Sequence, residues 1–572
     1  MSIISPSEIS ARYNIKLTGV IHVGAHEGEE VEEYLSLGLS KICLFEANKA
    51  LKETLDVICR AHKEVSAEFY AISDRVGLAN FDLTSSSQSS SLLGLKLHAD
   101  IYPDISKVDR IVVETRTLDS LFSDERLEGI NLLNIDVQGA ELLVLRGGER
   151  VLQNIDVIIA EINYAELYEG CPTVEEIDLF LFDHGFMRVD TKTPHHPTWG
   201  DAAYVRSSFI KDLSFIHADK RFKTSMSSLG NNGRFANQMF QYLFIVMYAL
   251  RSGCKPIAPA FPAASYLSAC VTSQEEVKLL PLPWLETAET SFLETSHPPR
   301  NVDIWGYFQA VPQVYRTHRA FIREMLKPRL DIEEAAGAWI RNAYSRYKRI
   351  IGLHIRRGDY TEYDDNKVSR FARVPIEFYI RLLNEIYEDG DAIFISTDDE
   401  SEFQYFKDFP VLNTLLERPS VIAGLHGDFY ILSQCDVTAY CNSSWSLMSG
   451  LLAKEGQRAL LIDFSKRAFL PFDPWSGLFF WSRFVPAGFA GMLREWQDSN
   501  IRFIEEFALT NERLTLANER LAQANDRIIR ARLMSPVVER ISAHHMTHAI
   551  ERRIESVLSS WQRIKFRFLR IK

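Results

Sequence analysis

The chain has 572 residues, of which 46% are hydrophobic and 24% charged, and its formal net charge is −12. Two or three domains are expected, because single hydrophobic cores stop growing at roughly 250 to 300 residues. The acidic balance argues against a protein that binds nucleic acid over its whole surface, since phosphate contacts need a basic face.

The N-terminal sequence lacks the basic and apolar regions of a secretory signal. The longest apolar run, residues 239–250, is too short to cross a bilayer. Seven scattered cysteines without a CxxC pair are interpreted as reduced thiols. We therefore expect a cytoplasmic protein.

From Leu17 to about Ile210, short β-branched runs alternate with amphipathic segments of helical length. The runs are GVIHVGA, KICLFEA, AEFYAIS, RIVVETRTL, INLLNID, DVIIAEI and AAYVR. This alternation predicts βαβ units and a mostly parallel sheet. We assign residues 1–212 to a first α/β domain.

The first strand of this domain leads into a small-residue turn, in IHVGAHEGEEVEEYL. Gly24 and Gly28 allow the backbone to approach a ligand at the N-terminus of the next helix. Glu46 ends the second strand, where a carboxylate can accept both hydroxyls of a ribose. The spacing differs from GxGxxG and no pyrophosphate cradle is evident, which favours S-adenosylmethionine over a dinucleotide.

Two later strands also end in polar residues, with Asp136 in LLNIDVQGAE and Glu161 in IIAEINY. Open α/β sheets bind ligands at the carboxyl ends of their strands. Methyl transfer to an alcohol needs collinear positioning and an acceptor for the hydroxyl proton, and Asp136 or His26 can serve. The alternative role for Asp136 is to cap the following helix.

Together with CLFEANK and AISDRVGLANFDLTSSSQSSSL, these stretches resemble the FkbM-type O-methyltransferase family over about 200 residues. The resemblance implies a Rossmann-like class I methyltransferase domain that methylates a hydroxyl, often of a sugar, from S-adenosylmethionine. It places Gly24, Ala25, His26, Gly28 and Glu46 at the cofactor, Ser73 and Asp74 near its adenine, and Asp136 facing the methyl acceptor. The family pattern KIDVEGAE reads NIDVQGAE here, with Asn134 and Gln138, and FEPNP reads FEANK.

A second α/β series begins near Thr224 and continues through RIIGLHIRR, DAIFIST, DVTAYCN and ALLIDF to about Trp496. The Ser/Gly/Asn-rich stretch TSMSSLGNNG contains the boundary. We assign residues 224–496 to this second region, with two lobes.

Paired arginines stand at a strand end in IGLHIRRGDYTEY, residues 351–363. GRFANQMFQYLF is a small-residue turn that enters a helix, and NSS precedes another helix, where free N–H groups and the helix dipole favour an anion. A guanidinium binds a diphosphate bidentately. The combination predicts a site for a nucleotide-sugar donor.

The order of HIRRGDY, NQMFQY, GYFQ and NSSWS resembles the α-1,2-fucosyltransferases, inverting enzymes that use GDP-fucose, over roughly 260 residues. The resemblance implies a GT-B fold with two facing Rossmann-like lobes. It places Arg356 on the β-phosphate, His354 and Asp428 near the guanine, Ser443 and Ser444 on the phosphates with Asn442 beside them, Arg357 in a structural or secondary role, and Gly233, Asn237 and Gln238 across the cleft. The family's NSSFSWW reads NSSWSLM here, so the acceptor side departs from the pattern.

Inverting transfer makes the sugar oxocarbenium-like while negative charge accumulates on GDP. A preorganised Arg356 can stabilise that charge by about 3 kcal/mol, so we expect no requirement for a divalent metal. Asp389 and Asp391 form a DxD that we interpret as turn chemistry. The candidate bases for the acceptor hydroxyl are Asp359, Glu362, Asp364 and Asp398. Asp359 leads by its proximity to the arginines, and its alternative role is an ion pair with Arg357.

Residues 497–572 have a different character. NERLTLA, NERLAQA and NDRIIRA, residues 511–531, are three heptads with the pattern of a coiled-coil seam, which favours either a homo-oligomer or packing on the protein's own body. From Ile501 onward, 14 Lys and Arg against 8 Asp and Glu carry +6, so the preceding residues carry −18. The final WQRIKFRFLRIK is either a solvated end or a contact with an anionic membrane surface or a lipid-linked glycan.

The leading hypothesis is a bifunctional enzyme that transfers fucose to an oligosaccharide or polysaccharide and O-methylates a sugar hydroxyl. Fusion raises the effective concentration if one product feeds the other site. The first alternative is a fucosyltransferase whose N-terminal domain only binds cofactor or glycan. The second is a glycan-binding scaffold, which would not need the proposed diphosphate clamp.

Overall fold

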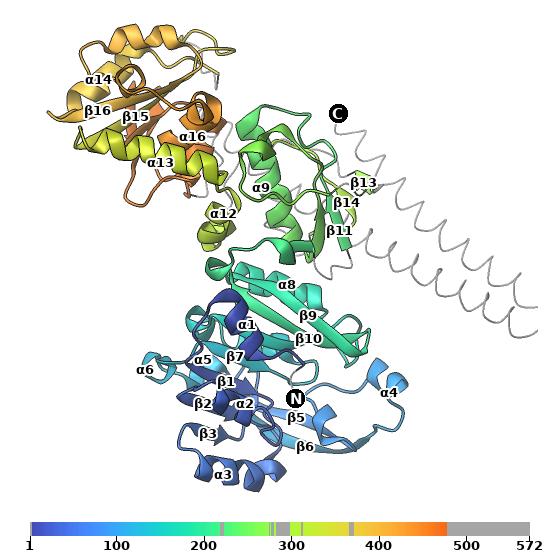
Figure 1. Cartoon of the computed structure of the whole chain (residues 1–572). Helices are drawn as coiled ribbons and strands as arrows, with labels where there is room; N and C mark the ends of the chain where they lie inside the picture. Colours follow the sequence, from blue (N-terminus) through green and yellow to red (C-terminus); the bar gives the residue numbers. More distant parts are fainter. Residues whose placement is uncertain are drawn as a thin grey trace, which may run out of the picture.

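The computed structural model describes residues 3–217, 222–273, 275, 279–281, 298–309, 313–364 and 371–476. The predicted coiled coil and basic tail, residues 497–572, lie outside this part of the chain. Three α/β units follow one another along the molecule (Figure 1). We call them the N-terminal unit (3–217), the first lobe (222–309) and the second lobe (330–476).

The N-terminal unit is built on a seven-stranded sheet of order β3-β2-β1-β7-β8-β10-β9. The strands are β1 (Gly19–Val23), β2 (Lys41–Phe45), β3 (Val65–Glu68), β7 (Leu132–Ile135), β8 (Val157–Asn163), β9 (Phe186–His196) and β10 (Trp199–Arg206). The first five are parallel, and β10 is antiparallel to both of its neighbours. Every residue of β1 and β8 is buried, as expected for strands covered on both faces. The strand order reverses between β1 and β7, which is where open α/β sheets bind ligands.

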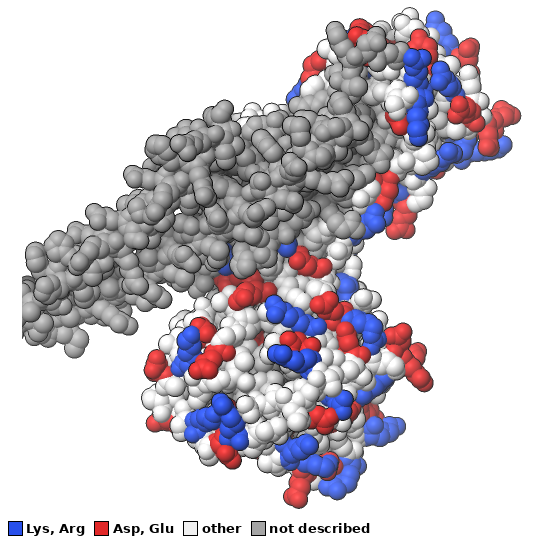
Figure 2. Space-filling model, turned by 180° about the vertical axis from the view of Figure 1, so that it is seen from behind, with Lys and Arg blue, Asp and Glu red and all other residues white. Residues whose placement is uncertain are grey.

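The helices of this unit have apolar faces that pack on the sheet. They are α1 (Pro6–Tyr13), α2 (Val31–Ser36), α3 (Lys52–Ala61), α5 (Leu118–Leu121), α6 (Asp124–Leu127), α7 (Glu141–Arg146) and α8 (Val174–Asp183). A small sheet of order β4-β6-β5 lies beside the main one, with β4 (Ala71–Ile72), β5 (Gly77–Thr84), β6 (Lys107–Arg116) and the short helix α4 (Leu97–Ile101). On the face shown in Figure 2, acidic and basic side chains are interspersed over this unit.

The first lobe has a parallel sheet of order β12-β11-β14-β13. Its elements are β11 (Phe222–Ser225), α9 (Phe235–Arg251), β12 (Cys254–Ile257), β13 (Leu280–Pro281) and β14 (Val302–Asp303). Every residue of α9 except Asn237 is buried, so the longest apolar run of the sequence is a core helix. None of the described helices is long and apolar enough to cross a membrane.

The second lobe has a five-stranded sheet of order β16-β15-β17-β18-β19, parallel except for β19. The strands are β15 (Arg349–Ile355), β16 (Asp391–Thr397), β17 (Val437–Tyr440), β18 (Arg458–Asp463) and β19 (Ala468–Pro471), and the main helices are α13 (Leu330–Tyr344), α14 (Ile376–Ile386), α16 (Leu425–Gln434) and α17 (Ser444–Leu451). The connecting segment contains α11 (Gln313–Thr317) and α12 (Arg319–Met325). The two lobes meet where α17 packs on α9. The predicted mixed α/β architecture with mostly parallel sheets is thus present.

The N-terminal unit and the first lobe are joined by a packed seam. Helix α8 of the N-terminal unit contacts α9 of the first lobe. In the connecting segment, His318 is buried, and the centroid of its ring lies 4.1 Å from that of Phe182 in α8. Nε2 of His318 is 2.8 Å from the backbone oxygen of Phe182. Arg251 of α9 forms a bidentate ion pair with Asp183, with N–O distances of 2.9 and 3.0 Å. One hydrophobic cluster includes residues of all three units. The apolar core is therefore continuous across the junctions between the units.

Candidate active sites

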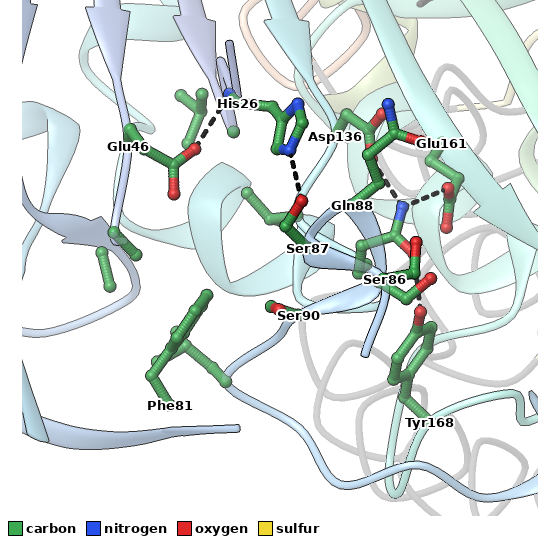
Figure 3. A pocket seen from close by; sticks show the side chains of 18 of the residues that line it. His26, Glu46, Phe81, Ser86, Ser87, Gln88, Ser90, Asp136, Glu161 and Tyr168 are labelled. Atoms are coloured by element: carbon green, nitrogen blue, oxygen red, sulfur yellow. Dashed lines mark hydrogen bonds between the residues drawn. The ribbon is translucent and has the colours of Figure 1, made fainter. Parts of the chain in front are cut away.

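A cavity of about 430 Å³ lies at the switch point between β1 and β7 (Figure 3). The carboxyl ends of β1, β2, β7 and β8 line it, and the serine-rich loop 86–90 covers one side. Of the predicted cofactor and acceptor residues, Gly24, His26, Glu46 and Asp136 line this cavity. The topology therefore brings together side chains that are more than 100 residues apart.

Gly24 allows the turn after β1 to pass the end of β7 closely. Its φ is +85°, and a Cβ there would lie 1.8 Å from the backbone oxygen of Asp136. The N–H groups of Gly24 and Ala25 donate to the oxygen of Phe45 at 2.9 and 3.1 Å. Gly28 also has a positive φ, +79°, and a Cβ on it would meet Ile58 at 2.8 Å. Both glycines allow close packing of the turn after β1, but only Gly24 lines the cavity, whereas Ala25 and Gly28 do not.

Glu46 is held at the end of β2 by two backbone donors. Its Oε2 accepts from the N–H of His26 at 2.9 Å, and its Oε1 accepts from the N–H of Asn48 at 2.7 Å. Burial raises the pKa of Glu46, and these backbone hydrogen bonds act in the opposite direction. Each carboxylate oxygen has more than one lone pair, so both can still accept from a ligand diol. The arrangement fits the predicted ribose contact.

His26 fastens the serine-rich loop to the turn. Its Nδ1 lies 2.9 Å from Oε1 of Glu29, and its Nε2 lies 2.8 Å from Oγ of Ser87 (Figure 3). With both ring nitrogens engaged, His26 orients the loop. Asp136 is therefore the better placed of the two proposed proton acceptors.

Gln138 is the hub of a polar network on the opposite wall. Its Nε2 donates to Oδ1 of Asp136 and to Oε2 of Glu161, both at 2.7 Å, and its Oε1 accepts from the hydroxyl of Tyr168 at 2.6 Å. The backbone at Gln138 is left-handed, with φ +56°, which directs the side chain across the strand ends. One amide thus connects two carboxyl groups that would otherwise repel each other.

The carboxyl groups of this wall have raised pKa values. Burial raises the pKa of Asp136 to about 6, and the hydrogen bond from Gln138 limits the rise. Burial, reinforced by the neighbouring carboxyls of Asp136 and Glu141, holds the pKa of Glu161 well above its usual value. At neutral pH, Asp136 is then mainly ionised while Glu161 retains its proton. An ionised Asp136 in the cavity can accept a hydroxyl proton.

Asp74 and Ser73, predicted near the adenine, do not line the cavity. Asp74 pairs with Arg75 at 3.3 Å, and Ala71 and Ile72 line that side instead. Sequence reasoning also missed several lining residues. They are Phe81, Tyr102, Gln138, Tyr168, Trp199, Asp201 and the loop serines. The serine run was the one available signal, since the others are separate residues that only the fold gathers.

The two adjacent arginines that follow β15 have different partners and different roles. Arg356 contacts Asp398 at 2.8 Å and Asp359 at 2.6 Å. Arg357 is buried and forms a bidentate pair with Glu402 at 2.7 and 3.1 Å. The suggested Arg357–Asp359 pair is therefore wrong, because Arg357 points into the lobe.

Asp359 joins the two lobes. Its second oxygen lies 2.6 Å from Nη2 of Arg234, the residue before α9. Burial acts to raise its pKa, but the hydrogen bonds from Arg356 and Arg234 lower that pKa overall. A carboxylate between two guanidiniums is a weak proton acceptor. Among the other candidate bases, Glu362 pairs with Arg373 at 2.6 Å.

The remaining predicted donor residues surround α17. Ser443 caps this helix, and its Oγ accepts from the N–H of Trp445 at 3.3 Å. Ser444 donates to Asn237 of α9 at 2.9 Å, a second contact between the lobes. Asn442 is buried and donates to the oxygen of Ala372 at 3.0 Å.

On the second lobe, His354 is buried and Asp428 is half-buried. His354 Nδ1 lies 2.7 Å from Oγ of Ser446, and burial lowers its pKa to about 3, which keeps the ring neutral. Burial raises the pKa of Asp428 to about 6 despite its ion pair with Arg418. The DxD aspartate Asp391 is buried and pairs with Arg349 at 2.6 Å, as expected for a structural turn. In the described part of the chain, no group of three or more His, Cys, Asp or Glu residues is arranged to hold a metal ion.

The sheet order defines an α/β unit with a cavity at the switch point, where such sheets commonly bind ligands. Residues 22–187 match the model of the methyltransferase FkbM domain, so the N-terminal unit contains such a domain. The 2-O-methyltransferase NoeI of Sinorhizobium fredii (strain NBRC 101917 / NGR234) is 32% identical over 164 residues. That alignment covers 26% of this chain and 65% of the relative.

Two solved structures give further, more distant similarity. The methyltransferase FkbM of Methylobacillus flagellatus KT aligns with a TM-score of 0.24 and 12% identity, over 33% of this chain and 43% of that one. The fucosyltransferase NodZ of Bradyrhizobium aligns with a TM-score of 0.31 and 16% identity, over 43% of this chain and 96% of that one. These scores are too low to assign a fold or an activity.

Proposed function

We propose that the N-terminal unit transfers a methyl group from S-adenosylmethionine to a sugar hydroxyl. The observation that carries this proposal is the Asp136–Gln138–Glu161 network in the cavity of a methyltransferase FkbM domain. Gly24 lets the turn after β1 pass close to the end of β7, and Glu46 presents acceptors to a ribose. When bound, the cofactor supplies an electrophilic methyl group. Asp136 would accept the proton of the acceptor hydroxyl.

The departures from the family pattern are compatible with this chemistry. Asn134 does not line the cavity, and its Nδ2 donates to the buried hydroxyl of Tyr34 at 2.7 Å. Gln138 does line it, and it holds Asp136 in place. The alternative, a domain that binds cofactor or glycan without catalysis, predicts that Asp136 can be neutralised without consequence.

We propose further that the two lobes form a GT-B-type inverting fucosyltransferase that uses GDP-fucose, with α-1,2 linkage as the expected product. The motif order supports the donor, and so does the position of Arg356 where the two lobes meet at Asp359. Arg356 would neutralise charge on the departing GDP after exchanging its carboxylate partners for the diphosphate. An O-methylated fucose on a glycan would be the joint product.

Mass spectrometry of an oligosaccharide incubated with GDP-fucose, with and without S-adenosylmethionine, tests both proposals. We expect a deoxyhexose gain that Arg356→Met abolishes and a methyl gain that Asp136→Asn abolishes. Arg346→Met and Asp408→Asn, at exposed positions, are the matched controls. Methylation that persists in Asp136→Asn would remove its role as proton acceptor, and fucose transfer by Arg356→Met would remove the donor assignment.

A further inference from the structure

The cavity of the N-terminal unit has two ends, which lie along one edge of the main sheet. The strands that line it are neighbours in the order β2, β1, β7, β8 and β10. Neighbouring strands are about 4.8 Å apart, so β2 and β10 are separated by roughly 19 Å. Glu46 follows β2, Asp136 follows β7, and Trp199 begins β10 at the same edge, paired with Asn163 of β8. The part of the cavity over β8 and β10 therefore lies beyond Asp136 from the predicted ribose contact, and Glu46 and Tyr168 are on opposite sides in Figure 3.

Aromatic rings gather at the β10 end of the cavity. Trp199 donates from Nε1 to the hydroxyl of Tyr102 at 3.0 Å. The ring of His98 is next to two tyrosine rings, with centroid distances of 5.0 Å to Tyr102 and 5.3 Å to Tyr168. All four residues line the cavity, although they come from three separate segments of the chain. We call these four residues the aromatic end.

The aromatic end is held in place by the backbone and by packing. The N–H of His98 donates to the oxygen of Leu167 at 3.1 Å. Leu167 and Tyr168 belong to a small hydrophobic cluster against which Trp199 packs. The hydroxyl of Tyr168 donates to Oε1 of Gln138 at 2.6 Å, the residue that also holds the proposed proton acceptor. The rings are thus fixed relative to the site of the proposed chemistry.

His98 has an unsatisfied polar atom at this end of the cavity. Its side chain is buried, and its Nδ1 has no hydrogen-bond partner among the described residues. Burial lowers the pKa of His98, so the ring is neutral at neutral pH and has one donor and one acceptor. A buried polar group without a partner costs free energy, and native proteins rarely leave one. Because the ring lines the cavity, a ligand hydroxyl bound there can supply a hydrogen bond that the protein does not.

We infer that the aromatic end is the subsite for the methyl acceptor and takes a neutral sugar unit, with Trp199 and Tyr102 against its C–H groups and His98 bonded to one of its hydroxyls. This inference rests on the proposed methyl transfer. A sugar ring suits such a subsite because it presents apolar C–H groups and hydroxyls on the same small body, and binding pockets combine aromatic walls with a few fixed polar groups.

Separate KM values for acceptor and cofactor test the inference. His98→Phe keeps an aromatic ring but removes both nitrogens, and Trp199→Leu keeps an apolar side chain but removes the ring. In methylation of a neutral fucosylated oligosaccharide by the full chain, each should raise the KM for the oligosaccharide about fivefold, as for loss of one neutral hydrogen bond or one aromatic contact. The KM for S-adenosylmethionine should not change.

Two further variants separate hydrogen bonding from packing. His98→Gln restores a polar group near the position of Nε2 and should recover most of the acceptor affinity that His98→Phe loses, whereas a role in packing alone predicts no such recovery. Tyr405→Leu, at an exposed aromatic position of the second lobe, should leave both KM values unchanged. If Trp199→Leu fails to fold, the comparison of His98→Phe with His98→Gln decides the inference by itself.

Titration calorimetry of the full chain with S-adenosylhomocysteine provides a readout that does not depend on turnover. We expect wild type and the variants at His98 and Trp199 to bind it equally. Weaker binding in these variants with an unchanged KM for the oligosaccharide would assign the aromatic end to the cofactor and overturn the inference. An unchanged KM for the oligosaccharide in every variant would also overturn it, while methyl transfer would stand. Absence of both S-adenosylhomocysteine binding and methylation in wild type would overturn the proposed function, and the inference with it.

Discussion

Replacement of Gln138 by methionine should shift the pH dependence of methyl transfer. The change keeps the side-chain length but removes the donor shared by Asp136 and Glu161 and the acceptor used by Tyr168. A hydrogen bond to a charged group contributes about 1.5–3 kcal/mol, and one pKa unit corresponds to about 1.4 kcal/mol. Loss of the bond should therefore raise the pKa of Asp136 by about one unit, from about 6 to about 7.

The direction of the effect follows from the protonation state that the reaction needs. Asp136 must be ionised to take the hydroxyl proton, so the rate rises with pH through its pKa. With the pKa moved from about 6 to about 7, the ionised fraction at pH 6 falls about fivefold, whereas at pH 8.5 it is nearly unchanged. Gln138→Met should be slow in acid and recover in base.

A pH–rate profile by mass spectrometry measures this shift, and the exposed Gln153→Met is the control. Thermal unfolding gives a second readout that does not depend on turnover. A carboxyl whose folded pKa is raised stabilises the fold at low pH and loses that contribution as pH rises through the folded value. The fall in Tm between pH 5 and pH 8 should therefore be larger in Gln138→Met. An equal loss of rate at every pH would refute the role given to Gln138.

Three further predictions concern the cavity turn, the seam and the arginine pair. Gly24→Ala should abolish cofactor binding in calorimetry, because the added Cβ would overlap the backbone at the end of β7. The control is Gly38→Ala, which has a similar φ of +73° but open space around it and should retain binding. Equal binding by both variants would contradict the close contact between the turn at Gly24 and the end of β7. Burial lowers the pKa of His318 to about 4. The neutral ring therefore contributes fully to the free energy of unfolding above about pH 6.5, and this contribution of about 3 kcal/mol is lost as pH falls to about 4. In denaturant titrations at several pH values, His318→Gln should largely remove this pH dependence. Arg357→Met should lower the free energy of unfolding by about 3–5 kcal/mol, because it leaves Glu402 buried without its partner. Arg356→Met should lower the free energy of unfolding less and weaken the binding of the donor more. If Arg356→Met were the more destabilising variant and Arg357→Met the one that weakened donor binding more, the roles given to the two arginines would be exchanged.

The α/β framework was predictable because buried strands and amphipathic helices leave separate periodic patterns. The runs around Val20, Ile42 and Leu133 became neighbouring parallel strands, and the residues after them met at one edge. Glycines with an obligatory positive φ, such as Gly24, were readable for the same reason.

What the sequence could not reveal depends on contacts between distant residues. Gln138 was noticed as a departure from a pattern, but its bonds to Glu161 and Tyr168 exist only once β7, β8 and the following loop are in place. Asp201 lies on a strand whose alternation says nothing about a cavity. Asp359 and Arg234, which likewise pair, are 125 residues apart in sequence and belong to different lobes.

The continuous core through α8 and α9 also affects how genetic variants should be interpreted. A substitution that destabilises this seam would lower the abundance of the whole polypeptide and so reduce both proposed activities at once. Its phenotype would imitate a double knockout. Assigning a biological role to either unit therefore calls for substitutions in the cavity of the N-terminal unit or at Arg356, where one proposed activity can be removed while the polypeptide persists at normal levels.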